Sequence, residues 1–474
     1  FYDLVIEVAI VRPGPIQGDM VHPYLRRRNG EEPVDYPSKE LEDILGRTLG
    51  VPLFQEQAMK IAIVAAGFTP AEADGLRRSM ATFKAKGLVT QYEEKLIKGM
   101  MKNGYTLEYA QRVFKQLEGF GSYGFPESHA ASFALLVYVS SWIKWYYPDV
   151  FCCAILNSMP MGFYQPSQLI GDAKKHDVEI RPVDINYSVW DNKLEEKSGK
   201  FCALRLGFRQ VKGLREDDIE ILVSARNKMY NSINELRDIS IPEAALEKLA
   251  DADAFRSIGL DRRKALWEVS TKDRSVEIFK GQQPADAKDE NISLPVMAKS
   301  EHVVHDYAAT SFSLKGHPVS FIREKLDQLY ITPTEQLSTL KDGALVKVAG
   351  LVLVRQRPGT AAGICFMTIE DETGNANLVI WESLFEKFRK EIIQSKLIMV
   401  EGKLQIEGEV IHVIVQRCYN FSRLLRQLTP SQEDPPVLTL AYPDEKSVPP
   451  GLDKRSQPKE SSQKRIFPGG RNFK

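Results

Sequence analysis

The chain has 474 residues, of which 43% are hydrophobic and 27% are charged. This length suits about three domains of roughly 150 residues each, so a single compact domain is excluded. Lysine plus arginine and aspartate plus glutamate each number 63. No overall excess of charge therefore directs the chain to nucleic acid or to a membrane surface, and any basic binding surface must be local.

Membrane insertion and a disulfide framework are also disfavoured. The most apolar stretch, residues 133–156, is interrupted by Lys144, Pro148 and Asp149 before it reaches the roughly 20 apolar residues of a transmembrane helix. The 5 cysteines are odd in number and lack metal-ligand spacing, which favours a reducing compartment. We expect a cytoplasmic protein without a membrane contact. Because the chain starts at Phe1 and enters an apolar helical pattern directly, we expect it to be part of a longer protein.

Helical periodicity dominates the first part of the chain. Apolar residues recur at three- and four-residue spacing in 41–45, 58–66 and 109–117, which is typical of amphipathic helices. From residue 181 to about 277 we expect further short helices, with two glycine-containing turns that each lie between amphipathic helices. Residues 278–312 lose periodicity and become more polar, as a linker does.

The period changes to two after Leu345. Strands are predicted over residues 345–354, 364–369, 376–380, 397–404 and 410–415, with a helix over 383–394 between the third and the fourth. Five strands with a helix at this point predict an OB-type barrel.

These patterns predict a multidomain α+β chain. Its predicted parts are a mostly helical domain (1–180), a tandem helix-hairpin-helix region (181–290), a linker with a connecting helix (291–339), a five-stranded OB-fold barrel (340–425) and a basic, proline-rich, disordered tail (426–474).

Two arginine motifs in the helical domain are candidate phosphate-binding sites. Arg12 stands in the turn Arg12-Pro-Gly-Pro15, where the prolines leave little backbone entropy to lose. Arg77 and Arg78 belong to a run of cations without an acid, and a guanidinium pair can fork onto triphosphate oxygens. The alternatives are an ordinary helix connection for Arg12 and a solvated basic face for the pair.

A third motif of the helical domain is rich in glycine and aromatic residues. Residues 119–133 combine a permissive backbone with rings that can stack on a base or a sugar, and His129 begins a helix there. A capping or core role for His129 is the alternative.

The two glycine turns form a pair. Lys212 and Gly213 stand in the first turn, and Ser257 and Gly259 in the second. In a helix-hairpin-helix the hairpin N–H groups and the following helix N-terminus hold a phosphate. Sequence-independent binding of duplex DNA is the functional interpretation, and a purely structural helix pair is the alternative.

Basic and aromatic residues are spread over the predicted barrel. Arg355 and Arg357 are expected on the loop after the first strand, Trp381 near the sheet and Lys403 on the fourth strand. Such a combination suits single-stranded DNA. Phe366 is an aromatic that fits the core equally well. No predicted strand carries the paired carboxylates of a two-metal site.

Together these motifs resemble the C-family DNA polymerases, the bacterial DNA polymerase III alpha subunits, from residue 1 to about 425. The residues that carry the resemblance are Arg12-Pro-Gly-Pro15, Phe54-Gln-Glu-Gln57, Leu76-Arg-Arg-Ser-Met80, Tyr123-Gly-Phe125, Ser128-His129-Ala-Ala and Gly316-His-Pro318. Segments 80–84, 125–129 and 470–474 are similar to the error-prone branch, often called ImuC.

The resemblance implies that residues 1–180 are polymerase fingers and that Arg77, Arg78, Arg12 and His129 bind the incoming dNTP. It also implies that the catalytic aspartates and their Mg²⁺ lie upstream of Phe1. The parent protein would be a DNA-directed DNA polymerase of damage-induced translesion synthesis. We expect this chain alone to be inactive, with no catalytic residue, metal site or cofactor of its own.

The implied partners are primer–template DNA, dNTP and, at the barrel, the single-stranded template. Replicative members of the family carry a clamp-binding peptide after the hairpins, but residues 292–297 lack its glutamine and its terminal aromatic. We therefore expect an indirect contact with the sliding clamp, through an ImuB-like mutasome partner. A replicative alpha subunit and a non-enzymatic DNA-binding module remain the alternative interpretations.

Overall fold

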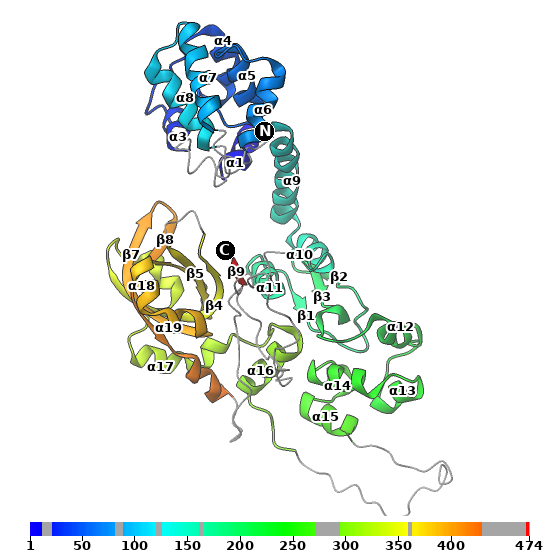
Figure 1. Cartoon of the computed structure of the whole chain (residues 1–474). Coiled ribbons are helices and arrows are strands. Elements are labelled where there is room, and N and C mark those ends of the chain that lie inside the picture. Colours follow the sequence, from blue (N-terminus) through cyan, green and yellow to red (C-terminus); the bar gives the residue numbers. More distant parts are fainter. Residues whose placement is uncertain are drawn as a thin grey trace, which may run out of the picture. The chain divides into compact units, whose positions relative to one another are not determined.

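The computed structural model describes residues 1–11, 21–80, 89–119, 126–160, 165–270, 294–358, 363–428 and 471–473. The chain divides into two compact units, residues 1–146 and 147–474 (Figure 1). None of the helices within these described ranges is long and apolar enough to span a bilayer.

The regular secondary structure among the described residues of the first unit is entirely helical. Its helices are α1 (Tyr2–Ile10), α3 (Val21–Arg28), α4 (Lys39–Leu45), η1 (Gly46–Thr48), α5 (Gln55–Val64), α6 (Pro70–Met80), α7 (Val89–Lys102), α8 (Leu107–Gly119) and α9 (Glu127–Tyr146). The helical patterns predicted at 41–45, 58–66 and 109–117 are confirmed as parts of α4, α5 and α8. Their apolar positions meet in one core, which includes Leu41, Phe54, Ile61, Leu76 and Leu117.

The second unit begins with α10 (Pro148–Asn157) and α11 (Pro166–Lys175), which pack on a small sheet. The sheet has the order β1-β3-β2, with β1 (Ile180–Arg181), β2 (Lys193–Ser198) and β3 (Phe201–Arg205). The expectation of only short helices after residue 181 was wrong here. A turn at Gly199, whose φ of 69° favours glycine, joins β2 and β3 into a hairpin.

Short helices follow the small sheet. They are η3 (Phe208–Gln210), α12 (Glu216–Ser224), α13 (Ile233–Asp238), α14 (Glu243–Asp251), η4 (Arg256–Ile258) and α15 (Arg262–Ser270). The second glycine turn lies between α14 and α15, as predicted. The first does not lie between two amphipathic helices, because only the three-residue η3 precedes it.

Part of the predicted linker is a packed helix. Residues 271–293 lie outside the described part, but residues 299–310 form α16 (Lys299–Thr310). Its Val303, Val304 and Tyr307 are buried together with residues of η6 (Pro318–Ile322), α17 (Arg323–Gln328) and the barrel strands. α16 is the connecting helix predicted within residues 291–339. The polar pattern of residues 278–312 did not indicate its burial, because its apolar residues become a core only when the barrel packs on them. The 3₁₀ helix η7 (Thr334–Thr339) leads into the barrel.

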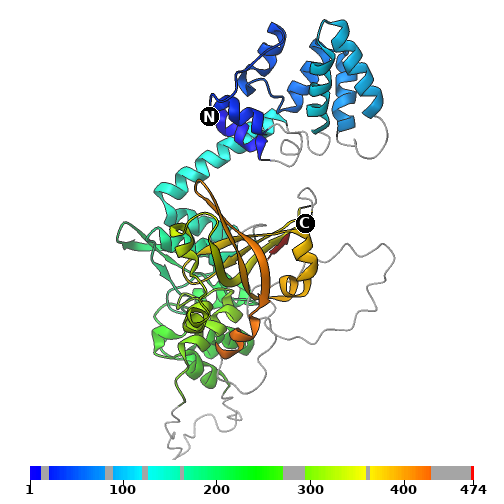
Figure 2. The ribbon, with the colours of Figure 1, turned by 90° about the vertical axis from the view of Figure 1, so that its left-hand side faces the viewer.

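The barrel confirms the predicted OB fold. Its strands are β4 (Leu345–Gln356), β5 (Cys365–Glu370), β6 (Asn375–Ile380), β7 (Leu397–Glu407) and β8 (Val410–Asn420). The sheet order β5-β6-β8-β7-β4 closes through an antiparallel pairing of β4 with β5. Figure 2 shows β7 and β8 as a long hairpin. Between β6 and β7 the predicted single helix is divided into α18 (Glu382–Lys387) and α19 (Arg389–Gln394).

The end of the chain contributes one further strand. After η8 (Ser422–Leu428), residues 429–470 lie outside the described part, so the predicted disorder of the tail is not described there. Residues Arg471–Phe473 form β9, which pairs in parallel with β4. The prediction of a disordered tail was therefore wrong for these three residues.

Candidate nucleic-acid interface

Arg77 and Arg78 lie in the last turn of α6, which is anchored from its other face. Ala73 and Leu76 are both fully buried. At the start of the helix Thr69 N donates to Glu72 Oε2 at 3.0 Å, and Glu72 N donates to Thr69 Oγ1 at 3.3 Å. Such reciprocal capping satisfies backbone donors that have no partner within a helix.

One carboxylate holds both guanidinium groups. Asp74 Oδ1 is 2.8 Å from Arg77 Nη2, and Asp74 Oδ2 is 2.7 Å from Arg78 Nη2. The hydrogen bond from Arg77 and the charge of Arg78 hold the pKa of Asp74 below its ordinary value. The three side chains keep one net positive charge, and the Arg78 side chain is 75% exposed. This end of α6 therefore offers a pre-oriented cationic pair to an anion.

The other two predicted nucleotide contacts are less well defined. Arg12 lies outside the described residues. His129 is exposed near the start of α9, where its ring centroid is 4.6 Å from that of Phe133. Residues 120–125, which belong to the same predicted motif, also lie outside the described part. Of the three predicted residues that the structure describes, Arg77 and Arg78 are brought together by their shared ion pairs with Asp74.

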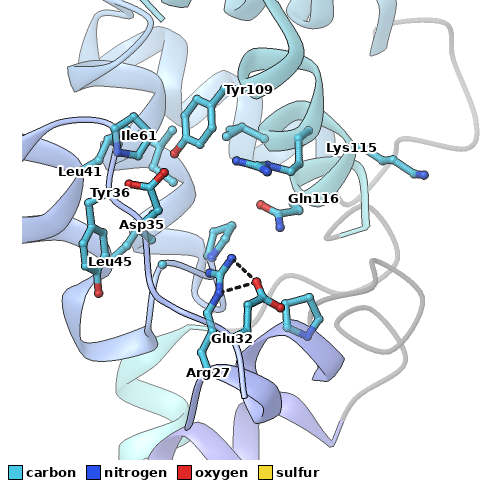
Figure 3. A pocket seen from close by; sticks show the side chains of 16 residues that line it. Arg27, Glu32, Asp35, Tyr36, Leu41, Leu45, Ile61, Tyr109, Lys115 and Gln116 are labelled. Carbon is cyan, nitrogen blue, oxygen red and sulfur yellow. Dashed lines mark hydrogen bonds and ion pairs between the residues drawn. The ribbon is translucent and has the colours of Figure 1, made fainter. Parts of the chain in front are cut away.

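A pocket of about 260 Å³ opens among α3, α4 and α8 of the first unit (Figure 3). At its wall Arg27 donates to Glu32 Oε1 at 3.0 Å and to the Leu49 carbonyl at 2.8 Å. Arg112 lies 5.1 Å from the centroid of the Tyr109 ring, and burial raises the pKa of Tyr109 to about 12. No predicted site residue lines this pocket, because its residues come from segments that only the fold brings together.

The first hairpin is used for packing. Lys212 Nζ donates to the carbonyls of Tyr307 and Ala308 at 2.9 and 3.0 Å, and burial lowers its pKa to about 8. The carbonyl of Gly213 accepts from Lys248 Nζ. These contacts contradict the predicted DNA-binding role of Lys212, since its ammonium already caps the end of α16. The role of Gly213 stays a prediction, because the bond from Lys248 engages its carbonyl and not its N–H.

Ser257 in the second hairpin is also structural. Its Oγ donates to Asp184 Oδ1 at 2.7 Å, and its N–H donates to Asp184 Oδ2 at 3.1 Å. Asn186 Nδ2 donates to the same Oγ at 2.9 Å. The prediction that Ser257 contacts DNA is therefore corrected: this side chain connects the hairpin to the segment after β1.

The backbone at Gly259 leaves room for the predicted phosphate contact, while its own N–H donates to the Arg256 carbonyl at 3.0 Å. Its φ of 80° is left-handed, and a Cβ added to it would meet no atom within 4 Å. The backbone is therefore open to close approach by a ligand. Lys264 is exposed in the first turn of α15, which has 9 residues and begins just after this hairpin. A cation beside a helix N-terminus adds to its attraction for a phosphate. Sequence reasoning missed Lys264, although the run Arg262-Arg-Lys264 at a predicted helix start was a signal.

We expect Lys264→Ala to weaken duplex binding by removing one phosphate contact. The slope of log affinity against log salt concentration should become shallower by about 0.9 for that contact. Fluorescence anisotropy with two unrelated duplex sequences over a salt series measures it, and both sequences should lose affinity equally. Lys228→Ala is the control, because Lys228 is an exposed lysine that belongs neither to this hairpin nor to α15. An unchanged slope would mean that Lys264 touches no phosphate.

Arg355 is a core residue of the barrel. It lies within β4 and not on the following loop, and it is only 7% exposed. Its Nε donates to the Ile392 carbonyl at 2.7 Å, and its Nη2 donates to the Ser395 carbonyl. Burial lowers its pKa to about 10. The predicted role in DNA binding is thus contradicted: the guanidinium holds the end of α19 against β4.

Arg357 stabilises the loop after β4. Its Nη2 is 3.0 Å from Glu382 Oε1, and its Nη1 is 3.6 Å from Glu386 Oε1. Its Nε donates to the Gly363 carbonyl at 3.1 Å, and the guanidinium lies 4.5 Å from the centroid of the Phe385 ring. Two carboxylates thus offset the charge of Arg357 and hold its side chain against α18. A phosphate would have to compete with them for the guanidinium.

The outer face of the barrel carries the aromatic and basic groups that suit single-stranded DNA. Phe366 is opposite Val379, Val379 is opposite Ile414, and Ile414 is opposite Lys403, so Phe366 and Lys403 share one row across the sheet. Trp381 follows β6 directly. Trp381 is 51% exposed and Phe366 37%, which contradicts the alternative that Phe366 belongs to the core. The face combines two aromatic surfaces with the exposed Lys403.

Comparison with protein families agrees with the order of these parts. The bacterial DNA polymerase III alpha subunit finger domain matches residues 1–104. A helix-hairpin-helix motif matches residues 177–265, and an OB-fold nucleic acid binding domain matches residues 346–420.

Whole-chain relatives decide the family. An error-prone DNA polymerase of Sinorhizobium medicae is 52% identical over 90% of this chain and 40% of its own length. Error-prone DNA polymerase 2 of Agrobacterium fabrum is 54% identical over 89% of this chain and 40% of its own length. An error-prone DNA polymerase of Rhodopseudomonas palustris is 50% identical over 100% of this chain and 44% of its own length. This chain belongs to the error-prone branch of the DNA polymerase III alpha family. It spans about two fifths of the length of these curated relatives.

Family membership confirms the resemblance inferred from the motifs. The matched finger domain includes α6, so the pair Arg77 and Arg78 lies in a polymerase fingers region. The match to the helix-hairpin-helix motif includes Gly259 and Lys264, and the OB-fold match includes Phe366, Trp381 and Lys403. The three surfaces described above therefore lie in the segments that match the finger domain, the helix-hairpin-helix motif and the OB-fold nucleic acid binding domain.

Proposed function

We propose that this chain forms the nucleotide- and DNA-binding part of an error-prone, DNA-directed DNA polymerase that copies damaged templates. The observation that carries the proposal is the 50–54% identity, over 89–100% of this chain, to proteins named error-prone DNA polymerase. Because the chain covers 40–44% of those relatives, nucleotidyl transfer is assigned to the complete protein. We keep the predicted division into fingers, hairpin region, barrel and tail within this proposal.

In the first unit, Arg77 and Arg78 bind the triphosphate of the incoming dNTP. The shared carboxylate of Asp74 fixes both guanidinium groups on one helix end, so less side-chain entropy is lost when an anion binds. Arg12 and His129 are retained as further nucleotide contacts on the strength of the family resemblance.

In the second unit, the two nucleic-acid surfaces bind different forms of DNA. The open backbone at Gly259 and the exposed ammonium of Lys264 on α15 contact phosphates of the primer–template duplex. Such contacts carry no sequence preference, because every phosphate is alike. The barrel face with Phe366, Trp381 and Lys403 binds the single-stranded template, because every base offers a ring face for stacking.

The metal ions of the proposed reaction belong to the complete polymerase. In-line nucleotidyl transfer uses Mg²⁺ held by carboxylates. Within the described ranges no three histidine, cysteine or acidic side chains gather as metal ligands. The residues present do not fit such a site, and we propose that carboxylates outside this chain hold the Mg²⁺.

Clamp contact is proposed to be indirect. The segment 292–297 lacks a glutamine and a terminal aromatic, and its Met297 is packed at 8% exposure. An ImuB-like partner protein would then connect the polymerase to the sliding clamp. For the complete protein we propose a location in the bacterial cytoplasm, where its DNA template is found.

The proposal is tested by comparing binding with extension. The purified chain should bind a labelled primer–template in an anisotropy assay and should leave the primer unextended when Mg²⁺ and all four dNTPs are added. The relatives' longer polypeptide should extend the same primer. Templated extension by this chain alone would overturn the assignment of catalysis to the rest of the protein, and a failure to bind DNA would overturn the assignment of the surfaces.

We expect Trp381→Ala to weaken binding of single-stranded DNA by about 1–3 kcal/mol, or roughly fivefold to a hundredfold, since one stacked base is lost. The melting temperature should change little, because the side chain is 51% exposed. Anisotropy with a short oligothymidylate measures affinity. Trp145→Ala is the control, because Trp145 is 71% exposed but lies on α9, outside the proposed DNA surfaces. Equal losses in both variants would exclude the barrel face as the binding surface.

A further inference from the structure

Each of the two barrel strands that flank β4 pairs with only part of its length. β7 pairs with β4 from Leu345 to Leu351, and β5 pairs with it from Leu351 to Gln356. On the β7 side, the pairing ends with Val352 N donating to the Lys396 carbonyl at 2.9 Å. Beyond that bond, none of the strands β5 to β8 pairs with this side of β4 in the described residues. The last residues of β4 therefore present a free half-edge to any extended segment.

The chain's own C-terminal strand lies on this half-edge. β9 pairs in parallel with β4, with Val354 opposite Arg471, Arg355 opposite Asn472 and Gln356 opposite Phe473 (Figure 2). The barrel itself does not need β9, because β4 and β5 already close it. β9 is therefore an added strand, joined to a complete fold.

We propose that the half-edge of β4 at Val354–Gln356 is a strand-addition site for an extended peptide, and that residues 471–473 of the same chain are its resident occupant. Backbone hydrogen bonds supply the affinity in such a site. A three-residue pairing makes few of them, so it is weak as a contact between separate molecules. The connection through residues 429–470 compensates, because a linked segment acts at an effective concentration in the millimolar range. The occupant is thus held in place yet exchangeable.

The first experiment removes the occupant. In a chain that ends at residue 470, the backbone amide hydrogens of Val354–Gln356 that face β9 should exchange at least tenfold faster than in the full chain, as measured by hydrogen–deuterium exchange. Those that face β5 should keep their rates, because that pairing is unchanged. Amides of β7 and β8 serve as the internal control and should keep their rates, because their pairing does not involve β9. Unchanged rates at Val354–Gln356 would overturn the proposal.

The second experiment returns the occupant as a separate molecule. A fluorescein-labelled synthetic peptide of residues 466–474 should bind the shortened chain saturably in an anisotropy titration. The full chain should bind it at least tenfold more weakly, because its own strand competes. Equal binding by the two chains, or no binding by the shortened one, would contradict the assignment.

A pair of variants of the full chain separates backbone pairing from side-chain packing. Asn472→Pro with Phe473→Pro removes two consecutive N–H groups, and consecutive N–H groups of a strand point to opposite sides, so one of them faces β4. Asn472→Ala with Phe473→Ala removes the same side chains and keeps both groups. In the double proline variant the amides of Val354–Gln356 should exchange as in the shortened chain. In the double alanine variant they should exchange as in the full chain. Equal effects of the two pairs would overturn a backbone-based site.

The same measurement distinguishes the chain's own strand from that of a second copy. Protection of Val354–Gln356 should be independent of protein concentration over a hundredfold range. Protection that increases with concentration would show that the strand comes from another molecule and would contradict its assignment as an occupant in the same chain.

Discussion

Replacing Arg262 by methionine is expected to destabilise the hairpin region by about 3 kcal/mol or more, because a buried charge network loses its central donor. Arg262 is fully buried on α15. Its Nε donates to the Asp251 carbonyl at the end of α14 at 2.8 Å, and its Nη1 donates to the His302 carbonyl of α16 at 2.9 Å. Its Nη2 forms an ion pair with Asp306. One guanidinium thus joins three helices.

The measurement must be local, because a chain of several domains does not unfold in one step. Hydrogen exchange of amides in α14, α15 and α16 under native conditions reports the free energy of opening of this region. Arg263→Met is the matched control: Arg263 is the next residue, it pairs with Glu301 at 2.8 Å, and its side chain is 30% exposed. We expect Arg263→Met to lower the free energy of opening by less than about 1 kcal/mol, because the ion pair it removes is partly exposed. Similar losses in the two variants would contradict the central role of Arg262.

Acid should reveal the same network. Burial by itself raises the pKa of Asp306, but the charges of Arg262 and Lys315 outweigh it and hold the pKa below its ordinary value. Folding therefore favours the charged carboxylate. Its contribution is present above the unfolded pKa of about 3.9 and is lost as the pH falls through the lower folded pKa. In the Arg262→Met variant that folded pKa should rise, so the protection of α16 should be lost at a higher pH than in the unchanged protein.

The second large effect is expected at α6. In the complete polymerase, Arg77→Ala and Arg78→Ala should each lower kcat/KM for correct dNTP insertion by roughly tenfold to a hundredfold, because each removes a charge-assisted hydrogen bond to the triphosphate worth about 1.5–3 kcal/mol. Binding of primer–template should change little. Steady-state single-nucleotide insertion gives kcat/KM, and anisotropy gives DNA affinity.

Two further variants make the α6 prediction specific. Arg77→Lys keeps the charge and loses the planar fork, so it should recover only part of the activity. Lys98→Ala is the control for general charge loss, because Lys98 is 77% exposed on the neighbouring helix α7. If both arginine variants kept the kcat/KM of the unchanged enzyme, the pair would be a solvated basic face, which is the alternative that the sequence left open.

Local patterns in the sequence were enough to predict most of the elements. In the barrel, β5 places Cys365, Met367 and Ile369 inside and Phe366 and Thr368 outside. A period of two is a property of the strand itself, so it can be read before any partner is known. The helices α4, α5 and α8 were predicted for the same reason, since their apolar spacing is local. Family motifs around Arg77 and Arg78 likewise depend only on residue order.

The hydrogen-bond partners of the polar side chains could not be predicted in this way. Lys212, Ser257 and Arg355 have the composition of DNA contacts, yet their donors are directed at Tyr307, Asp184 and Ile392, which are far away in the sequence. The strand β9 and the burial of the connecting helix α16 were missed for a related reason, because each depends on an edge or a core that another part of the chain supplies.

The sequence by itself therefore determined the kind of most elements and the family of this protein, but not the small sheet of β1, β2 and β3. The tertiary structure alone decided which cations face solvent, such as Lys264 and Lys403, and which are used inside the fold, such as Lys212 and Arg355. The physical reason is that hydrophobic periodicity is fixed by the backbone geometry of each element. A charged side chain instead takes the nearest acceptor that the fold places beside it, because a buried donor without a partner is strongly unfavourable.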